Sequence, residues 1–160
     1  MSDMSLVYGT ALTVFGAAFA AALPGIGSAK AVGAVGEAAS GVIAEDPEKY
    51  GKLLILQALP GTQGIYGLVS FFLILWKSGI LGGQGPVDLR LGFMFALASL
   101  PIALAGYYSA IAQGKTCEAG VALVAKDPDQ QTKCLVMGAM VETYAILALL
   151  ATLLLVFNIK

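Results

Sequence analysis

Hydrophobic residues fill four long stretches of this 160-residue chain, and short polar links separate them. Each apolar stretch has more than 20 residues, which is enough for an α-helix to cross the hydrocarbon core of a bilayer. The pattern therefore predicts an all-α membrane protein with four transmembrane helices. The predicted helices cover Ser5–Ala44, Leu53–Trp76, Leu91–Ala125 and Cys134–Ile159.

Two of the polar links contain an Asp-Pro pair, Asp46-Pro47 and Asp127-Pro128. Asp can cap a helix and Pro suits the first turn of the next one. The middle link, residues 77–88, is rich in glycine and is expected to be a loop. The links thus predict two tight helical hairpins with a looser connection between them.

Basic residues are unevenly divided between the two ends of the predicted bundle. Six of the nine lysines and arginines lie on the side of the Asp-Pro links, and three lie on the other side. Because cytoplasmic segments carry an excess of Lys and Arg, we expect a multi-pass protein of the cell membrane with both termini on the non-cytoplasmic side. The N-terminus lacks the basic segment of a signal peptide, so we expect the first apolar stretch to be retained.

The chain repeats itself with an offset of 81 residues. The repeat predicts two helical hairpins in the same orientation, residues 1–80 and residues 81–160. A repeated unit that buries little surface by itself is expected to stack with copies of itself. The matched positions are Gly25 with Gly106, Ser28 with Ser109, Gly33 with Gly114, Glu37 with Glu118, Asp46-Pro47 with Asp127-Pro128, Lys52 with Lys133, and Thr62 with Thr143.

Small residues recur every four positions in the first and third predicted helices. Such stripes let helix backbones approach closely in a membrane. We expect tight packing rather than a phosphate-binding loop, because no strand precedes the glycines. Pro24 and Pro101 lie in the same stretches and predict kinks. The stripes are Gly25, Ala29 and Gly33, and Gly106, Ala110 and Gly114.

Composition narrows the functions that the chain can have. Charged residues make up 12% of the chain, about half the share in soluble domains, and the net charge is −1. The absence of a basic cluster argues against nucleic-acid binding. There is no histidine, so imidazole catalysis and imidazole metal sites are excluded. Cys117 and Cys134 are expected to be small buried hydrophobic residues rather than a disulfide or a metal site.

One carboxylate, Glu142, lies inside the last apolar stretch. It follows Lys133 by 9 residues and precedes Lys160 by 18, which places it roughly 14 Å and 27 Å from the two polar ends at about 1.5 Å per residue. A bare charge at that depth costs at least about 2.5–3.5 kcal/mol, so it requires a partner or a function. The matching position in the first hairpin is Gly61, so this carboxylate occurs once per four helices.

Two further carboxylates, Glu37 and Glu118, lie shortly before the Asp-Pro links, close to Lys30 and Lys115. We expect these segments to extend past the headgroups, where the carboxylates make interfacial or inter-helix contacts. A role in lining an ion route is the alternative.

The second predicted helix carries a polar face at about the depth of Glu142. Neutral oxygen atoms around one carboxylate suit a small hard cation. A proton needs only the carboxylate and one acceptor, so the set favours sodium; hydrogen bonds that merely join the helices are the alternative. The face is formed by Leu59, Thr62, Gln63 and Tyr66, spaced i, i+3, i+4 and i+7, and Gln113 adds an amide from the third helix.

Four features together resemble a known family: the duplicated hairpin, LPGTQGIYG in the second helix, IAQGK in the third and MVETYAIL in the fourth. They are similar to the proteolipid (K or c) subunit of bacterial V-type ATPases, most closely its sodium-translocating branch, over nearly the whole chain. Pro60 by itself would free the carbonyl of Leu56, whereas the resemblance places the backbone ligand at Leu59. The sodium ligands that it implies are the Leu59 carbonyl, Thr62, Gln63, Gln113 and Glu142, with Tyr66 hydrogen-bonded to the glutamate.

The resemblance also implies the machine in which the chain works. It implies a homo-oligomeric rotor ring, with the first and third helices lining the inside and the second and fourth facing outward toward lipid. The implied partners are a stator membrane subunit with an arginine and central-stalk subunits at the cytoplasmic loops. The chain itself is then not an enzyme; it carries sodium ions while ATP is hydrolysed elsewhere in the complex.

Three alternatives remain compatible with the sequence. The same ring could carry protons, the chain could be a small secondary transporter coupled at Glu142, or it could be a structural membrane scaffold. Protection of Glu142 by sodium against carbodiimide distinguishes the sodium ring from the proton ring. Transport by the purified chain without an ATPase partner would indicate the secondary transporter.

Overall fold

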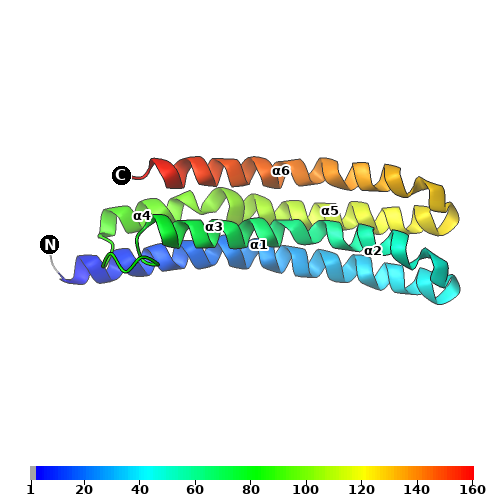
Figure 1. Cartoon of the computed structure of the whole chain (residues 1–160), viewed down its shortest axis with the longest axis horizontal. Helices are drawn as coiled ribbons and strands as arrows, with labels where there is room; N and C mark the ends of the chain where they lie inside the picture. Colours follow the sequence, from blue (N-terminus) through cyan, green and yellow to red (C-terminus); the bar gives the residue numbers. More distant parts are fainter. Residues whose placement is uncertain (1–2) are drawn as a thin grey trace.

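The computed structural model describes residues 3–160, which form a long bundle of helices (Figure 1). Its four segments Asp3–Glu45, Pro47–Lys77, Leu89–Lys126 and Pro128–Asn158 are long and apolar enough to cross a membrane. The four predicted spans are therefore confirmed, and each begins earlier than its apolar stretch. The helices are α1 (Asp3–Glu45), α2 (Tyr50–Ala58), α3 (Thr62–Lys77), α4 (Leu89–Ala98), α5 (Leu100–Lys126) and α6 (Gln131–Asn158), with short 3-10 turns η1 (Pro47–Lys49), η2 (Leu59–Gly61) and η3 (Pro128–Gln130).

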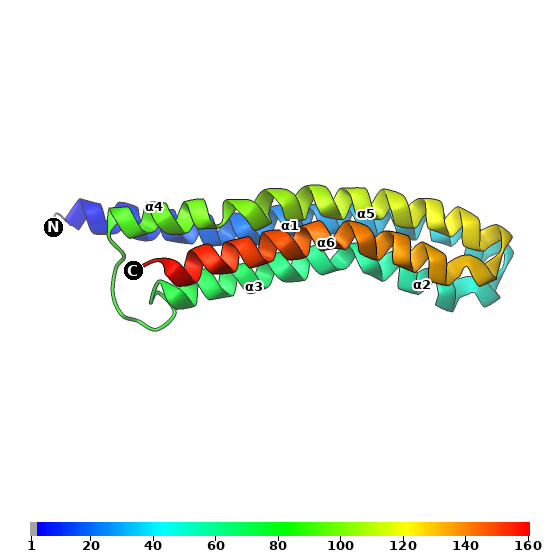
Figure 2. The same ribbon diagram turned by 90° about the horizontal axis from the view of Figure 1, so that it is seen from above.

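Both Asp-Pro links lie at one end of the bundle, and the start of α1 and the end of α6 lie toward the other (Figure 1). Viewed from above, α1 runs beside α5 and α3 runs beside α6 (Figure 2). Within the hairpins, α1 also packs on α3, and α5 packs on α6. The two hairpins are thus parallel neighbours, and residues 81 apart lie at similar levels in the bundle.

Each Asp-Pro link is a single tight turn that ends one helix and starts the next, as predicted. The Oδ1 atom of Asp46 accepts a hydrogen bond from the backbone N–H of Glu48 (3.2 Å), and that of Asp127 accepts one from Asp129 (3.1 Å). The side chain of Gln130 also donates to Asp127 (2.6 Å). Hydrogen bonds from Gln130 and from the Asp129 backbone hold the pKa of Asp127 below its ordinary value, because they favour the ionised carboxylate.

Glycines allow α1 and α5 to pack backbone against backbone. A Cβ atom placed on Gly27 would lie 2.8 Å from the carbonyl oxygen of Tyr107, and one placed on Gly114 would lie 2.6 Å from the Cβ atom of Ala31. These contacts leave no room for a larger side chain. The contact between the two hairpins therefore depends on glycine at these positions.

The two predicted small-residue stripes pack differently within the chain. Gly106 and Gly114 on α5 are buried against neighbouring helices, as expected. Gly25 and Gly33 on α1 are not in such a contact, because a Cβ atom placed on either meets no atom within 4 Å. Gly33 is exposed, whereas Gly25 is half-buried and its Cα atom lies 3.6 Å from the place of a Cβ atom on Gly64 of α3.

Pro24 and Pro101 differ in their effect on the helices. Pro101 follows a break at Ser99, where α4 ends and α5 begins, in agreement with the predicted kink. Pro24 lies inside α1, which continues through it as one helix. Its ring packs between α3 and α5, where Cβ atoms on Gly67 and Gly106 would lie 3.1 Å and 2.9 Å from its Cγ atom.

Apolar side chains form two separate cores, and a buried polar layer lies between them along the bundle. The core toward the chain ends includes Ala17, Ile74, Phe95, Ile102 and Val156. The core toward the Asp-Pro links includes Val35, Leu53, Leu56, Val121 and Val124. The polar layer contains Ser28, Gln63, Ser109 and Gln113, all of which are buried.

Candidate ion-binding site

The second membrane-spanning segment changes from α-helix to a 3-10 turn at Pro60, where α2 gives way to η2 and then to α3. Proline lacks an N–H and cannot continue the regular helical ladder. In the tightened turn, the backbone N–H of Thr62 donates to the carbonyl of Leu59, and the Thr62 hydroxyl donates to the same oxygen at 3.1 Å. The distortion therefore begins at Leu59 rather than at Leu56, and it brings a backbone oxygen and a hydroxyl together.

Two buried amides link α3 to α5 beside this turn. The Nε2 atom of Gln63 donates to the Oε1 atom of Gln113 at 2.5 Å, and both side chains are fully buried. The Nε2 atom of Gln113 donates in turn to the carbonyl of Gly138 on α6, at 3.1 Å. A Cβ atom on Gly138 would lie 3.1 Å from Cys117 and from Leu59, so glycine is what lets α6 come this close.

Ser109 belongs to the same network, although its chemistry did not single it out in the sequence. Its hydroxyl donates to the carbonyl of Val141 on α6 (3.1 Å) and lies 3.4 Å from the Nε2 atom of Gln63. The Oε1 atom of Gln63 is left facing the Thr62 hydroxyl, 3.5 Å away. The only sequence signal for Ser109 was its match to Ser28, which accepts a hydrogen bond from the backbone N–H of Gly64 at 2.9 Å.

Glu142 lies on α6 directly after Val141, the residue whose carbonyl accepts from Ser109, and it is half-buried. The hydroxyl of Tyr66, on α3, donates to its Oε1 atom at 2.5 Å. Within residues 3–160 this is the one hydrogen bond that the carboxylate makes to a side chain. Its second oxygen keeps its acceptor capacity for another ligand.

The structure thus brings the six predicted site residues into one polar layer at the junction of α3, α5 and α6. Leu59, Thr62, Gln63 and Gln113 are joined in sequence by hydrogen bonds, and Glu142 is attached to α3 through Tyr66. Within the described residues no group of three or more acidic, cysteine or histidine side chains could hold a metal ion. A cation bound here would accordingly meet one carboxylate and several neutral oxygen atoms.

Comparison with known proteins places this arrangement in a family. The family model for the C subunit of ATP synthase matches the chain twice, over residues 15–74 and 96–155. The chain belongs to the ATP synthase C-subunit family. The two matches are offset by the 81 residues of the internal repeat, and members of this family are non-catalytic, ion-translocating ring subunits of rotary ATPases, as predicted.

Two relatives of this family can be compared over most of the chain. The chain is 48% identical over 150 residues to the V-type sodium ATPase subunit K of Enterococcus hirae, covering 94% of this chain and 93% of that protein. It is 38% identical over 148 residues to the A-type ATP synthase subunit K of Methanocaldococcus jannaschii, covering 92% of this chain and 63% of that protein. The predicted resemblance to V-type proteolipid subunits is therefore confirmed, and the chain is a multi-pass membrane protein of an oligomeric ring.

The position in the first hairpin that matches the carboxylate of this ring protein is apolar. The offset pairs Glu142 with Gly61 and Gln113 with Val32. A Cβ atom placed on Gly61 would lie 3.7 Å from the Cγ2 atom of Val32, so these two positions face each other. The first hairpin thus has neither the carboxylate nor the amide at these two positions.

The other polar features of the sequence lie outside the site. Glu37 and Glu118 are exposed, and the Lys30 ammonium lies over the ring of Tyr107, 5.9 Å from its centroid. Cys117 and Cys134 are free and buried, as predicted.

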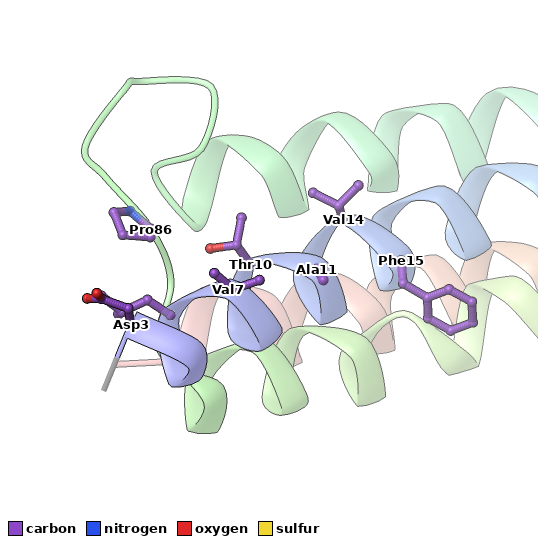
Figure 3. A pocket seen from close by; sticks show the side chains of 8 residues that line it. Asp3, Val7, Thr10, Ala11, Val14, Phe15 and Pro86 are labelled. Atoms are coloured by element: carbon purple, nitrogen blue, oxygen red, sulfur yellow. The ribbon is translucent and has the colours of Figure 1, made fainter. Parts of the chain in front are cut away.

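A hollow of about 820 Å³ opens between the start of α1 and Pro86, and includes none of the predicted site residues (Figure 3). Val7, Val14 and Phe15 make most of its wall apolar. Such a wall offers an ion few ligands, so we assign no ion to this hollow.

Proposed function

We propose that the chain is a rotor-ring protein that carries sodium ions through the membrane part of a V-type ATPase. The observation that supports this most strongly is the pair of fully buried glutamines held against a backbone carbonyl and a hydroxyl beside one carboxylate. A proton on Glu142 would need only one hydrogen-bond acceptor, whereas the Tyr66 hydroxyl here donates to the carboxylate. Burying two further amides is more readily explained by an ion that needs several oxygens in place of water.

The ligands in this proposal are the Leu59 carbonyl, the Thr62 hydroxyl, the amide oxygens of Gln63 and Gln113, and the Glu142 carboxylate. An amide oxygen has two lone pairs, so Gln113 can accept from Gln63 and still bind a cation. The hydrogen bond from Gln113 to Gly138 fixes the direction in which its oxygen points. Tyr66 holds the carboxylate rather than the ion.

Charge neutralisation explains how the site could move past lipid. Exposed apolar side chains such as Ile65 on α3 and Leu147 on α6 cover the outer face around the site, and a bare carboxylate there would be costly. Bound sodium cancels this charge, so a loaded site can leave the stator and rotate. An arginine of the stator membrane protein would then displace the ion on the far side.

We further propose the placement of the chain in the complex. With both termini on the non-cytoplasmic side, the two Asp-Pro links face the central stalk in the cytoplasm. Residues 1–80 then form a hairpin without a carboxylate, and residues 81–160 form the hairpin with the ion-binding glutamate. One ion per four helices gives fewer ions per turn than one per hairpin, which favours pumping against a steep gradient.

Carbodiimide labelling of the intact ATPase in membranes tests the choice of ion. The reagent attacks the protonated carboxyl, so sodium bound at Glu142 should slow labelling at fixed pH in a concentration-dependent way, whereas potassium should not. The variant E142Q is the control for labelling at other carboxyls. Equal labelling rates with and without sodium would contradict the sodium assignment and leave the proton ring as the better account.

A further inference from the structure

We propose that Ser28, on a helix that supplies no ligand, is a positioning residue of the proposed sodium site and holds the η2 turn in shape through the backbone of Gly64. The proposal deepens the proposed function and rests on it. It starts from a hydrogen bond that joins α1 to α3 at the level of the site. The Oγ atom of Ser28 accepts from the N–H of Gly64 at 2.9 Å, and Ser28 is only 6% exposed.

This hydrogen bond acts directly beside a proposed ligand, because Gly64 follows Gln63 in the chain. In a regular α-helix the N–H of residue 64 would donate to the carbonyl of residue 60. Here it donates to another helix, and α3 begins only at Thr62. The regular helical ladder thus loses two donors around this turn, the N–H that Pro60 does not have and the N–H that Gly64 gives to α1.

α3 lies close enough to α1 for a short side chain to bridge the two helices. A Cβ atom placed on Gly64 would lie 3.4 Å from the Cβ and Oγ atoms of Ser28. One turn further along α3, a Cβ atom placed on Gly67 would lie 2.6 Å from the carbonyl oxygen of Ala20. The two backbones therefore approach each other at these glycines, and the serine hydroxyl reaches the N–H directly.

The second hairpin has a matching serine that makes a different bond. Ser109 matches Ser28, but its hydroxyl donates to a backbone carbonyl of α6, that of Val141, at 3.1 Å. α6 continues past this point as one α-helix. A serine that donates to a carbonyl thus leaves its neighbouring helix regular, whereas the serine that takes an N–H accompanies the tightened turn.

The threonine hydroxyl of the site does not by itself explain the tightened turn. Thr62 donates to the carbonyl of Leu59, three residues back, at 3.1 Å. Thr143 makes the matching bond to Met140 at 2.7 Å, yet α6 is a regular helix there. The first hairpin has in addition a proline and an N–H directed to α1, so we assign the shape of η2 to these two features together.

Loss of the Ser28 hydroxyl would leave the N–H of Gly64 without its partner at a contact between membrane helices. A buried N–H requires an acceptor, and the carbonyl of Pro60 is its regular helical one. Pairing these two groups would draw η2 toward α-helical geometry. It would also displace two proposed ligands, the Leu59 carbonyl and the Thr62 hydroxyl. Ser28 therefore acts on the ion through the backbone and does not touch it.

Sodium protection of Glu142 against carbodiimide, measured in the intact ATPase, tests this role. The half-protecting sodium concentration should rise roughly three- to tenfold in S28A, the range for loss of one hydrogen bond. The ratio of the half-protecting lithium and sodium concentrations should change too, because displaced ligands alter the fit to cations of different size. The maximal rate of ATP hydrolysis in saturating sodium should stay that of the unaltered enzyme. S28T keeps the hydroxyl and should lie closer to the unaltered enzyme than S28A.

T13A is the matched control on the same helix. Thr13 is fully buried, its hydroxyl donates to the carbonyl of Gly9 at 3.0 Å, and it lies roughly 22 Å from Ser28 along α1. T13A should leave both half-protecting concentrations unchanged. An equal shift in T13A and S28A, or an unaltered value in S28A, would overturn the role of Ser28. Sodium protection in the unaltered ATPase would still support the proposed function.

A structure of the isolated S28A ring, determined without sodium, provides a test that does not depend on the ion. The N–H of Gly64 should pair with the carbonyl of Pro60 and residues 59–62 should become more regular, whereas the T13A ring should keep the tightened turn. An unchanged turn in S28A would overturn the positioning role. A changed turn without sodium protection in the unaltered ATPase would support that role and contradict the sodium assignment.

S28C takes the place of S28A if the alanine variant yields no ring. The thiol keeps the approximate size of the side chain and replaces the hydroxyl oxygen by a weak acceptor. The same shift in sodium protection and the same change in the turn are expected. An S28C ring that matches the unaltered ring in both measurements would count against the proposal.

Discussion

Gln113 contacts two other membrane segments at once. Its amide N–H donates to Gly138 on α6, and its oxygen accepts from Gln63 on α3. An amide fixed at its nitrogen presents its oxygen in one direction, so little side-chain entropy remains to be lost when a cation binds. For this reason the proposed sodium affinity should depend on Gln113 as well as on the charge of Glu142.

Replacing Gln113 by Ala should weaken sodium binding by about tenfold or more. The substitution removes one oxygen and leaves the Gly138 carbonyl without its donor, and such losses cost about 1–3 kcal/mol, where about 1.4 kcal/mol is tenfold in affinity. The measurement is the sodium concentration that halves the carbodiimide labelling rate of Glu142. Gln57→Ala, on α2 outside the proposed ligand set, is the matched control, and an equal shift in both variants would contradict the assignment.

Tyr66→Phe removes the hydrogen bond to Glu142 and keeps the ring that packs around it. A hydrogen bond to a charged group contributes about 1.5–3 kcal/mol, so we expect roughly a tenfold loss of sodium affinity with normal ring assembly. Sodium-dependent ATP hydrolysis by the intact complex gives the activation midpoint. Tyr8→Phe, at the start of α1, should leave that midpoint unchanged.

Three side chains of the candidate site could be predicted from the sequence because they share one helical face. Thr62, Gln63 and Tyr66 are polar at regular helical spacing in an apolar stretch. Ser109 could not be assigned in this way, since a lone serine in a membrane helix satisfies its own hydroxyl easily. Gly138 contributes only a backbone carbonyl, and no residue type reports where such an oxygen points.

At the scale of single elements, η2 is the feature that shapes the site. Pro60 replaces one regular turn by a tighter one, and this turn brings the Leu59 carbonyl and the Thr62 hydroxyl within 3.1 Å. Pro60 has no N–H, so it cannot donate to the carbonyl of Leu56, but the structure places the tightened turn at Leu59. The position of the distortion follows from local geometry that the sequence pattern does not contain.

Gly33 and Gly114 occupy matching positions in the repeat. We expect substitution by leucine to affect the fold of the chain at Gly114 and only the ring at Gly33. Gly114→Leu should prevent the α1–α5 contact inside the chain and destabilise its fold by at least about 1–3 kcal/mol, the usual cost of overpacking. Gly33→Leu should leave the single chain folded, because nothing lies within 4 Å, and should weaken only the ring.

Thermal unfolding and ring dissociation, each followed in detergent, separate these two effects. A single chain with Gly33→Leu that unfolds as readily as one with Gly114→Leu would contradict the different roles assigned to the two glycines.

The positions of the helices could be predicted from the sequence, but the continuation of α1 through Pro24 could not. All four spans follow from the apolar stretches, and the break before Pro101 follows from proline chemistry. Pro24 does not interrupt α1, since its ring is accommodated by Gly67 and Gly106 on two other helices. That accommodation depends on tertiary contacts, which residue spacing along one helix does not report.

At the scale of the whole molecule, the two hairpins share a fold and divide the chemistry. In the proposed site, the first hairpin supplies the Leu59 carbonyl, Thr62 and Gln63, and has Gly61 where the second has Glu142. The second supplies the carboxylate and Gln113. On this proposal neither half contains a complete set of ligands, so the duplicated chain would provide one site.

Glu142→Gln should abolish sodium transport while leaving the ring assembled. The amide cannot cancel the charge of a cation, yet it has the size of the carboxyl and can still accept from Tyr66. Glu118→Gln, an equivalent change at an exposed position of α5, should transport normally. Reconstituted vesicles loaded with radioactive sodium provide the assay. Normal transport by the Glu142 variant would contradict the mechanism, and a loss in the Glu118 variant would place that residue on the ion route.

A high-resolution structure of the isolated ring, determined in sodium and again after its removal, would show whether sodium occupies the proposed site. We expect a spherical density in sodium, in contact with oxygen atoms of Leu59, Thr62, Gln63, Gln113 and Glu142, and its loss without sodium. Density absent from this position in saturating sodium, or bound elsewhere in the ring, would contradict the proposed site.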